Sequence, residues 1–193
     1  DLAVLDLAAN GRLRLVVGAG YRQEEFTQFG LNMKKRPSLM ERGIETLKKA
    51  WTGEPFQFEG RTVRILPRPA QKPRPQIIMG GSSKAAAERA ARIADGFHGS
   101  PALNEMYENA LKAAGKPVPA DTRLPMRYFL LYVAKNPEEA WKKIGPHALH
   151  VNNAYAEWQK GMVPPAFVEA ASIADLQKSW VCKVVTPEEC VKM

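Results

Sequence analysis

The chain has 193 residues, of which 45% are hydrophobic and 25% are charged, as is usual for a globular protein with a sizeable core. Its formal net charge is +8, but the basic residues are scattered and are not interleaved with aromatic residues, so we expect no nucleic-acid partner. The sequence lacks an apolar run of the roughly 18 residues that a membrane helix needs, so we expect no membrane partner and a cytoplasmic location.

The apolar pattern changes several times in the first 75 residues, and turn signals mark the changes. Asn10-Gly11 ends the first apolar segment, and Gly18-Ala19-Gly20 ends the β-rich run that follows. Pro37 begins a segment with helical spacing that stops at Thr52-Gly53. The predicted elements are a helix over 2–9, a strand over 12–17, a helix over 37–52, a hairpin over 56–66 and an extended, proline-rich connector over 67–75.

The rest of the chain repeats a strand-then-helix order. A buried strand over 76–79 turns at Gly80-Gly81-Ser82 directly into a helix that is rich in alanine. Asn136-Pro137 combines an N-cap residue with a proline at the first helical position. The elements predicted after the glycine turn are a helix over 83–94, a strand over 95–99, a helix over 103–114, a strand over 126–134 and a helix from 136.

Strands that alternate with helices are typical of α/β proteins with parallel strands. The pattern predicts about four core strands, whereas a closed parallel barrel needs about eight. A small open sheet and the middle part of a barrel are both compatible with it.

The turn Gly80-Gly81-Ser82 is the clearest candidate for a binding site. A strand that runs into a helix start leaves several backbone N–H groups without partners, and the helix dipole favours an anion beside them. A plain turn with a serine N-cap is the structural alternative. Gly18-Ala19-Gly20 also follows a predicted strand, on the side where parallel barrels place their sites, although a tight turn alone would explain its glycines.

Metal ligands are not grouped in the sequence. His147 and His150 are one helical turn apart, but no other potential ligand completes a site near them. Cys182 and Cys190 lack the spacing of a metal motif. We therefore expect no metal site and two reduced thiols.

Several short motifs occur in the order that is found in one enzyme family. These motifs are Leu5-Asp6-Leu7-Ala8-Ala9-Asn10-Gly11-Arg12-Leu13, Val17-Gly18-Ala19-Gly20-Tyr21 with Glu25-Phe26, Trp51-Thr52-Gly53, Phe58-Glu59-Gly60, 69–75, Gly80-Gly81-Ser82 and Ala94-Asp95-Gly96. Each is weak alone, but their common order over about the first hundred residues is specific. The chain resembles an internal fragment of the bacterial luciferase-like family of flavin-dependent oxidoreductases.

The resemblance implies an α/β fold, as part of a (β/α)8 TIM barrel. The chain would supply about strands 4–7 and lack the first strands and the last. It would form a single domain over 1–193, incomplete at both ends, with the hairpin and proline-rich connector at 54–75 and a helical insertion at 145–180. In some relatives this insertion covers the barrel mouth, so Tyr155 and Trp158 have either a lid role or a packing role. The fragment alone is expected to be inactive and prone to aggregation, because an opened barrel exposes strand edges.

The implied activity is that of a monooxygenase that uses reduced FMN and dioxygen to oxygenate a small organic substrate. NAD(P)H would supply the electrons through a separate flavin reductase, and the full-length protein would be a homodimer. The catalytic residues would lie in the absent amino-terminal strands. The implied cofactor-binding residues are Gly18, Gly20, Tyr21, Gly80, Gly81 and Ser82.

Two alternatives remain on the same barrel. One is hydride transfer with a deazaflavin coenzyme, and the other is a flavin-binding relative without activity. Deazaflavin-dependent members of the family tend to carry an acid at the position of Tyr21, so the tyrosine favours FMN.

Overall fold

The computed structural model describes residues 1–119, 128–160 and 167–193, and it divides the chain into two units, Asp1–Leu124 and Pro125–Met193. The first unit contains α1 (Leu2–Ala8), β1 (Arg14–Val17), α2 (Gln23–Gln28), the 3-10 turn η1 (Met33–Lys35), α3 (Arg36–Thr52), β2 (Phe56–Phe58), β3 (Arg61–Val63), β4 (Gln76–Gly80), α4 (Lys84–Ile93), β5 (Gly96–His98) and α5 (Pro101–Ala113). The second unit contains β6 (Leu130–Val133), α6 (Pro137–Trp158), α7 (Ile173–Lys178), β7 (Cys182–Val185) and α8 (Pro187–Val191). None of the helices in the described ranges combines the length and the apolar character needed to cross a bilayer.

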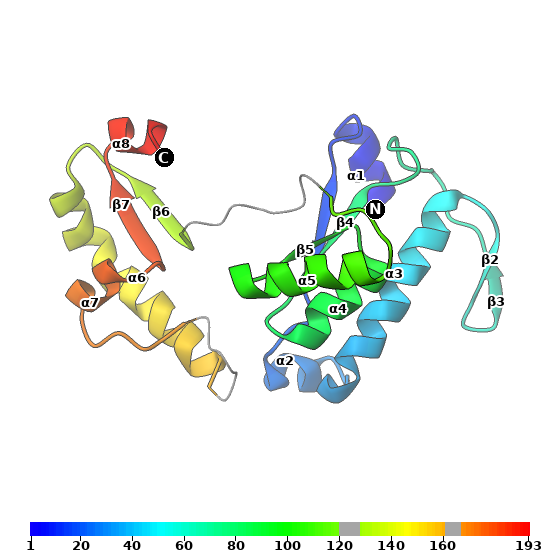
Figure 1. The fold of residues 1–193 in the computed structure, drawn as a ribbon, viewed down its shortest axis with the longest axis horizontal. Helices are drawn as coiled ribbons and strands as arrows, with labels where there is room; N and C mark the ends of the chain where they lie inside the picture. The colour runs from blue at the N-terminus through cyan, green and yellow to red at the C-terminus, as the bar shows by residue number, and fades with distance from the viewer. Residues whose placement is uncertain (120–127, 161–166) are drawn as a thin grey trace. The chain divides into compact units, whose positions relative to one another are not determined.

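Three parallel strands form the main sheet of the first unit, with β4 between β1 and β5 (Figure 1). Leu15 of β1 lies opposite Ile77 of β4, and Val17 lies opposite Met79. On the other side of β4, Met79 lies opposite Phe97 of β5. Helices connect these strands, so the structure confirms the α/β class with parallel strands that the sequence predicts.

Helices α3, α4 and α5 cover one face of this sheet (Figure 1). Ile77 and Met79, at alternate positions of β4, are buried in the core beneath them. Ala87, Ala90 and Ala91 of α4 are also buried, and their small side chains allow the helix to lie close to the strands. The core therefore holds α4 firmly behind the turn that precedes it.

A buried carboxylate fastens α1 to the proline-rich connector. Asp6 accepts hydrogen bonds from the backbone of Leu13 at 3.3 Å, the backbone of Gln71 at 2.9 Å and Nε2 of Gln71 at 2.8 Å. Burial alone would raise the pKa of Asp6, but these hydrogen bonds outweigh it and hold the pKa below its ordinary value. The connector is thus held in place although it contains no helix or strand.

The hairpin of β2 and β3 matches the hairpin that the sequence predicts in this segment. The two strands are antiparallel, and Phe58 lies opposite Arg61. Glu59 and Gly60 between them both have positive φ, at 47° and 76°. Two consecutive left-handed residues are typical of the tight turn that suits the twist of a hairpin.

The second unit has two parallel strands, in which Leu130 of β6 lies opposite Cys182 of β7. Helix α6 begins at Pro137 and continues through Pro146 to Trp158. This start agrees with the helix predicted from 136, and the helix continues into the segment 145–180 that is expected as an insertion, of which residues 161–166 lie outside the described residues. The predicted strand over 126–134 is shorter in the structure, and its residues 126 and 127 are likewise outside the described ranges.

Aromatic side chains pack together at the amino end of β6. The ring centroid of Tyr155 in α6 lies 5.2 Å from that of Phe129, 4.7 Å from that of Phe167 and 5.1 Å from that of Trp158. Phe129 directly precedes β6, so this cluster lies at the amino end of the strand. The ring contacts show that Tyr155 and Trp158 pack in this cluster, and a lid role for them stays a prediction.

Five strands in the described parts of the chain have a parallel partner, whereas the sequence pattern predicts about four core strands. The additional strand is β7, which has four residues, one of them Lys183. A run this short cannot display a clear period of two, and it is followed at once by Thr186, the N-cap residue of α8.

Candidate functional site

Three turns meet at the carboxyl edge of the sheet in the first unit. Gly18 follows β1, Gly81 follows β4 and Gly99 follows β5. Because these strands are parallel neighbours, the turns that follow them lie side by side. The two glycine segments predicted as binding elements, Gly18-Ala19-Gly20 and Gly80-Gly81-Ser82, are thus brought together at the edge where open α/β sheets bind ligands.

The turn after β4 leads directly into α4. Ser83 is the N-cap residue, because its Oγ accepts a hydrogen bond from the backbone of Ala86 at 3.3 Å. Ser82 is exposed and precedes the cap, so the capping role predicted as the structural alternative is filled by Ser83. The side chain of Ser82, next to the start of α4, is therefore accessible to a ligand.

Gly81 does not supply one of the several free amides that are expected at this turn. Its N–H donates to the carbonyl of His98 at 3.2 Å, so this amide is already used within the protein. A Cβ at Gly81 would lie 2.5 Å from Cβ of Ala86 and 3.2 Å from the ring of Phe97. Packing against α4 and β5 therefore explains why residue 81 is a glycine.

Other amides of the turn remain as possible donors. Lys84 and Ala85 belong to the first turn of α4, where backbone N–H groups have no acceptor within the helix. The amides of Ser82 and Ser83 donate to no backbone carbonyl in the described part of the chain. A Cβ at Gly80 would meet nothing closer than the carbonyl of Val17 at 3.7 Å, so neighbouring atoms do not crowd the backbone at Gly80. These donors and the dipole of a ten-residue helix suit a phosphate group.

The opposite end of α4 is stabilised by cations. Nζ of Lys116 donates to the carbonyls of Ala91 at 2.8 Å and Arg92 at 3.1 Å, and Nζ of Lys48 donates to the carbonyl of Ile93 at 2.5 Å. Burial, and then the nearby positive charge of Arg74, lowers the pKa of Lys48. Cations at the carboxyl end complement the helix dipole, and they leave its amino end as the end that attracts an anion.

The glycines after β1 have different surroundings. Gly20 has φ of +73°, and a Cβ there would lie 3.1 Å from the ring of Phe26, so the local turn requires a glycine. A Cβ at Gly18 would meet nothing within 4 Å, so the space beside it is open to a ligand. Tyr21 is half-buried and directly follows this turn.

Arg22 directly follows Tyr21, and its guanidinium could also contact a phosphate. It stands at the N-cap position of α2, and its guanidinium lies 3.5 Å from Glu25 and 3.9 Å from Glu24. These carboxylates offset its charge, so the backbone donors of α4 are the stronger anion site.

The turn after β5 is held by a residue of α5 that the sequence analysis did not single out. Asn104 accepts a hydrogen bond from the N–H of Gly99 at 3.1 Å and donates to the carbonyl of Gly99 at 3.2 Å. His98, the last residue of β5, is half-buried, and its carbonyl is the acceptor for Gly81. The only sequence signal for Asn104 is its place in the first turn after Ser100-Pro101, which starts α5.

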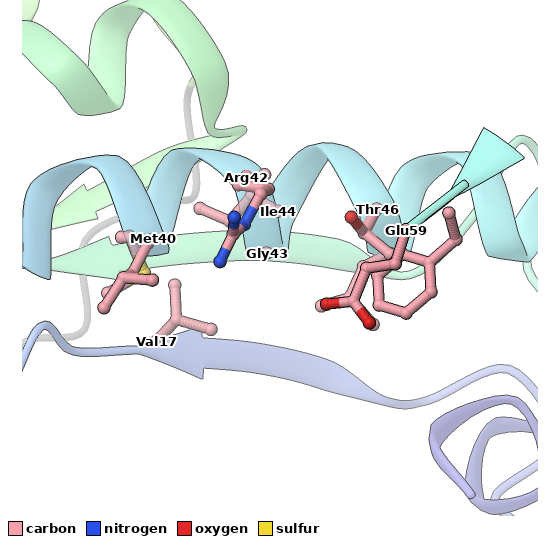
Figure 2. A pocket seen from close by; sticks show the side chains of 10 residues that line it. Val17, Met40, Arg42, Gly43, Ile44, Thr46 and Glu59 are labelled. Carbon is pink, nitrogen blue, oxygen red and sulfur yellow. The ribbon is translucent and has the colours of Figure 1, made fainter. Parts of the chain in front are cut away.

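A cavity of about 490 Å³ lies along α3 (Figure 2). Figure 2 shows Val17 and Met40 near one end of it and Glu59 near the other. The lining residues are Val17, Leu39, Met40, Arg42, Gly43, Ile44, Thr46, Leu47, Phe58 and Glu59. The cavity lies against α3, on the face of the sheet that the helices cover, and of its lining residues Val17 is the one at the end of a strand. The glycine turns lie at the carboxyl edge itself, so we take the turns and not this cavity as the candidate cofactor site.

Comparison with known proteins places these features in one family. The family model described as luciferase-like monooxygenase matches residues 1–190. The FMNH(2)-dependent dimethylsulfone monooxygenase of Pseudomonas putida is 36% identical over 105 residues, which are 50% of this chain and 29% of that protein. The F420-dependent glucose-6-phosphate dehydrogenase of Nakamurella multipartita is 39% identical over 95 residues, which are 45% of this chain and 27% of that protein.

A solved structure resembles the whole chain. Monooxygenase RslO1 from Streptomyces bottropensis superposes with a TM-score of 0.64 at 25% identity, over 96% of this chain and 64% of that one. The chain therefore spans less than two thirds of the length of each of these relatives.

Proposed function

The chain belongs to the luciferase-like monooxygenase family, and we propose that the protein uses reduced FMN and dioxygen to insert one oxygen atom into a small organic substrate. The observation that carries this proposal is the meeting of the open turn at Gly18 with the start of α4 at one sheet edge. A bound reduced flavin supplies the electrons for the reaction with dioxygen. The protein binds and orients the flavin and keeps water away from it.

The phosphate of FMN is proposed to bind at the start of α4. The amides of Ser82, Ser83 and Lys84 would donate to it, with the hydroxyl of Ser82 beside them. Gly80 would allow the close approach, while Gly81 would support the turn through its hydrogen bond and its packing. Gly18, Gly20 and Tyr21 would border the rest of the flavin, because their turn is next to that of α4.

We propose that the five parallel strands are consecutive strands of a (β/α)8 barrel. If β1 is the fourth, then β4, β5, β6 and β7 are the fifth to eighth in the order of the chain. This proposal extends the expected share of strands 4–7 by one strand, because β7 was not counted among the predicted strands. The similarity to RslO1 over 96% of the chain supports this assignment. The segments 54–75 and 145–180 would be insertions in a single barrel domain, and the catalytic residues would lie on the first three strands.

The proposal includes partners that the family resemblance implies. NAD(P)H would provide the electrons through a separate flavin reductase, and the full-length protein would be a homodimer. The substrate is a small organic molecule whose specificity residues would lie largely outside this chain.

A second candidate is hydride transfer with a deazaflavin. The F420-dependent relative at 39% identity supports it, and the FMNH(2)-dependent relative at 36% identity supports the first. Tyr21, at a position where deazaflavin-dependent members tend to carry an acid, favours FMN.

Titration of the full-length protein with FMN, riboflavin and F420, followed by tryptophan fluorescence, distinguishes the two candidates. We expect FMN to bind at least about tenfold more tightly than riboflavin, which lacks the phosphate. Preferred binding of F420 would support the second candidate. Failure to bind any of the three would contradict both.

The variant Ser82→Asp tests the position of the phosphate. A carboxylate at a helix start is compatible with the helix dipole, so the fold is retained, but it repels a phosphate at the same place. We expect FMN affinity to fall about tenfold or more and riboflavin affinity to stay unchanged. Ala171→Asp is the matched control, because Ala171 also directly precedes an N-cap serine, Ser172 of α7. An equal effect of both variants on FMN would contradict the phosphate position.

A further inference from the structure

One side chain holds the turn after β5 from both sides. Oδ1 of Asn104 accepts from the N–H of Gly99 at 3.1 Å, and Nδ2 of Asn104 donates to the carbonyl of Gly99 at 3.2 Å. Asn104 is on the first turn of α5, whose helix is capped by Ser100 and buried through Tyr107 and Leu111. A single amide group on an anchored helix therefore fixes the backbone of Gly99.

This turn is coupled to the turn after β4. The carbonyl of His98, which belongs to the peptide group that ends in the N–H of Gly99, accepts the hydrogen bond from Gly81 at 3.2 Å. The ring of Phe97 separates the two turns and is 1% exposed. A Cβ at Gly81 would lie 3.2 Å from this ring, and a Cβ at Gly99 would lie 2.5 Å from it. A shift of Gly99 would therefore move the acceptor and the surface on which Gly81 rests.

We propose that Asn104 is a positioning residue for the phosphate-binding turn at the start of α4. It fixes Gly99, Gly99 fixes the carbonyl of His98, and that carbonyl fixes Gly81. The amides that follow Gly81 are thereby held in place for an anion. This inference rests on the proposed function, because the anion is taken to be the flavin phosphate.

A purely structural role for Asn104 has a matched comparison in the second unit. Asn153 of α6 holds Ala170 in the same way, with Nδ2 donating to the carbonyl at 3.0 Å and Oδ1 accepting from the N–H at 3.0 Å. Loss of either side chain removes such a pair of hydrogen bonds, and loss of Asn153 also removes the bond that its Oδ1 accepts from Nδ2 of Asn152 at 2.8 Å. Only Asn104 is linked to the turn that precedes α4, so only its loss is expected to change phosphate recognition.

The experiment compares Asn104→Ala with Asn153→Ala in the full-length protein, using FMN and riboflavin as probes. We expect Asn104→Ala to reduce the ratio of FMN to riboflavin affinity about tenfold, because the phosphate loses aligned donors. Asn153→Ala is expected to leave this ratio unchanged. An equal loss of affinity for FMN and riboflavin in Asn104→Ala would overturn the proposal, since it indicates general damage.

Amide hydrogen exchange at Gly81 gives a readout that needs no cofactor. We expect this amide to exchange about tenfold faster in Asn104→Ala than in the wild type and at the same rate in Asn153→Ala. Unchanged exchange at Gly81 would overturn the proposal. If Asn104→Ala does not fold, Asn104→Asp serves instead in this exchange measurement, because it keeps the acceptor for Gly99 and replaces the donor with a carboxylate oxygen that cannot bind the carbonyl of Gly99. A wild type that does not prefer FMN to riboflavin would contradict the proposed function, while the exchange rate would still decide the role of Asn104.

Discussion

At the scale of single residues, Gly81 shows how a glycine serves packing in the turn that is proposed to bind phosphate. Its backbone does not have a positive φ, so conformational freedom is not the reason for a glycine. The reason is the 2.5 Å distance that a Cβ would have to Cβ of Ala86, on a helix whose core face is buried. The turn and the helix are thus in direct contact, and the position of one determines that of the other.

We predict that Gly81→Ala lowers the free energy of unfolding by about 2 kcal/mol, because α4 must move to admit the methyl group. Gly80→Ala is the control, since the nearest atom to its Cβ would be 3.7 Å away, an ordinary contact. Urea unfolding followed by circular dichroism measures both. An equal loss of stability in the two variants would show that contact with Ala86 is not the cause.

The sequence predicted that two glycine turns each follow a strand, but it did not show why each position is a glycine. Gly20 is required by its positive φ, Gly81 by packing, and Gly18 by neither of these. These causes depend on neighbours that are distant in the chain, such as Phe97 for Gly81. Asn104 was not predicted because its partner, Gly99, belongs to a turn whose geometry only the folded sheet defines.

At the scale of secondary-structure elements, Asp95 joins the connector to the sheet. Arg74 approaches it with two nitrogens, at 2.6 Å and 2.9 Å, and the N–H of Ile77 donates to it at 2.8 Å. Burial alone would raise the pKa of Asp95, but the ion pair with Arg74 and the hydrogen bond from Ile77 outweigh it and lower the pKa. The carboxylate therefore stabilises the folded state in its charged form.

This lowered pKa gives a defined pH dependence. Because the pKa of Asp95 in the folded state lies below its ordinary value of 3.8, the stabilisation is complete above that value and is lost as the pH falls through the folded pKa. We predict that Asp95→Asn lowers the free energy of unfolding by about 2 kcal/mol at neutral pH. The difference between the variant and the wild type should shrink below about pH 4. Urea unfolding over this pH range measures it, and a difference that does not change with pH would contradict the role of the charge.

Longer elements were predicted more accurately than short ones. The strand at β4, the alanine-rich α4 and the start of α6 at Pro137 agree with the sequence pattern. The short elements α2, α7 and β7 have too few residues to show a period, so tertiary packing decides them. Gly145-Pro146 suggested the start of a segment, yet α6 continues through it, and a Cβ at Gly145 would lie only 2.9 Å from Ile173 of α7. Gly145 therefore lies where α6 packs closely against α7, and it does not end the helix.

At the scale of the whole molecule, the order of the strands brings the site together. The turns after β1 and β4 are separated by α2, α3 and the hairpin in the sequence, but the strands before them are adjacent in the sheet. The parallel pattern in the sequence was sufficient to predict a common edge for such turns. It was not sufficient to predict which strands are neighbours, because register and order depend on long-range pairing.

The measurement that tests the proposed cofactor site most directly is a crystal structure of the full-length protein with bound FMN. We predict that phosphate oxygens lie within about 3 Å of the backbone nitrogens of Ser83 and Lys84, beside the hydroxyl of Ser82, with the flavin ring near Gly18. A phosphate held elsewhere, with no ligand at the start of α4, would contradict the assignment.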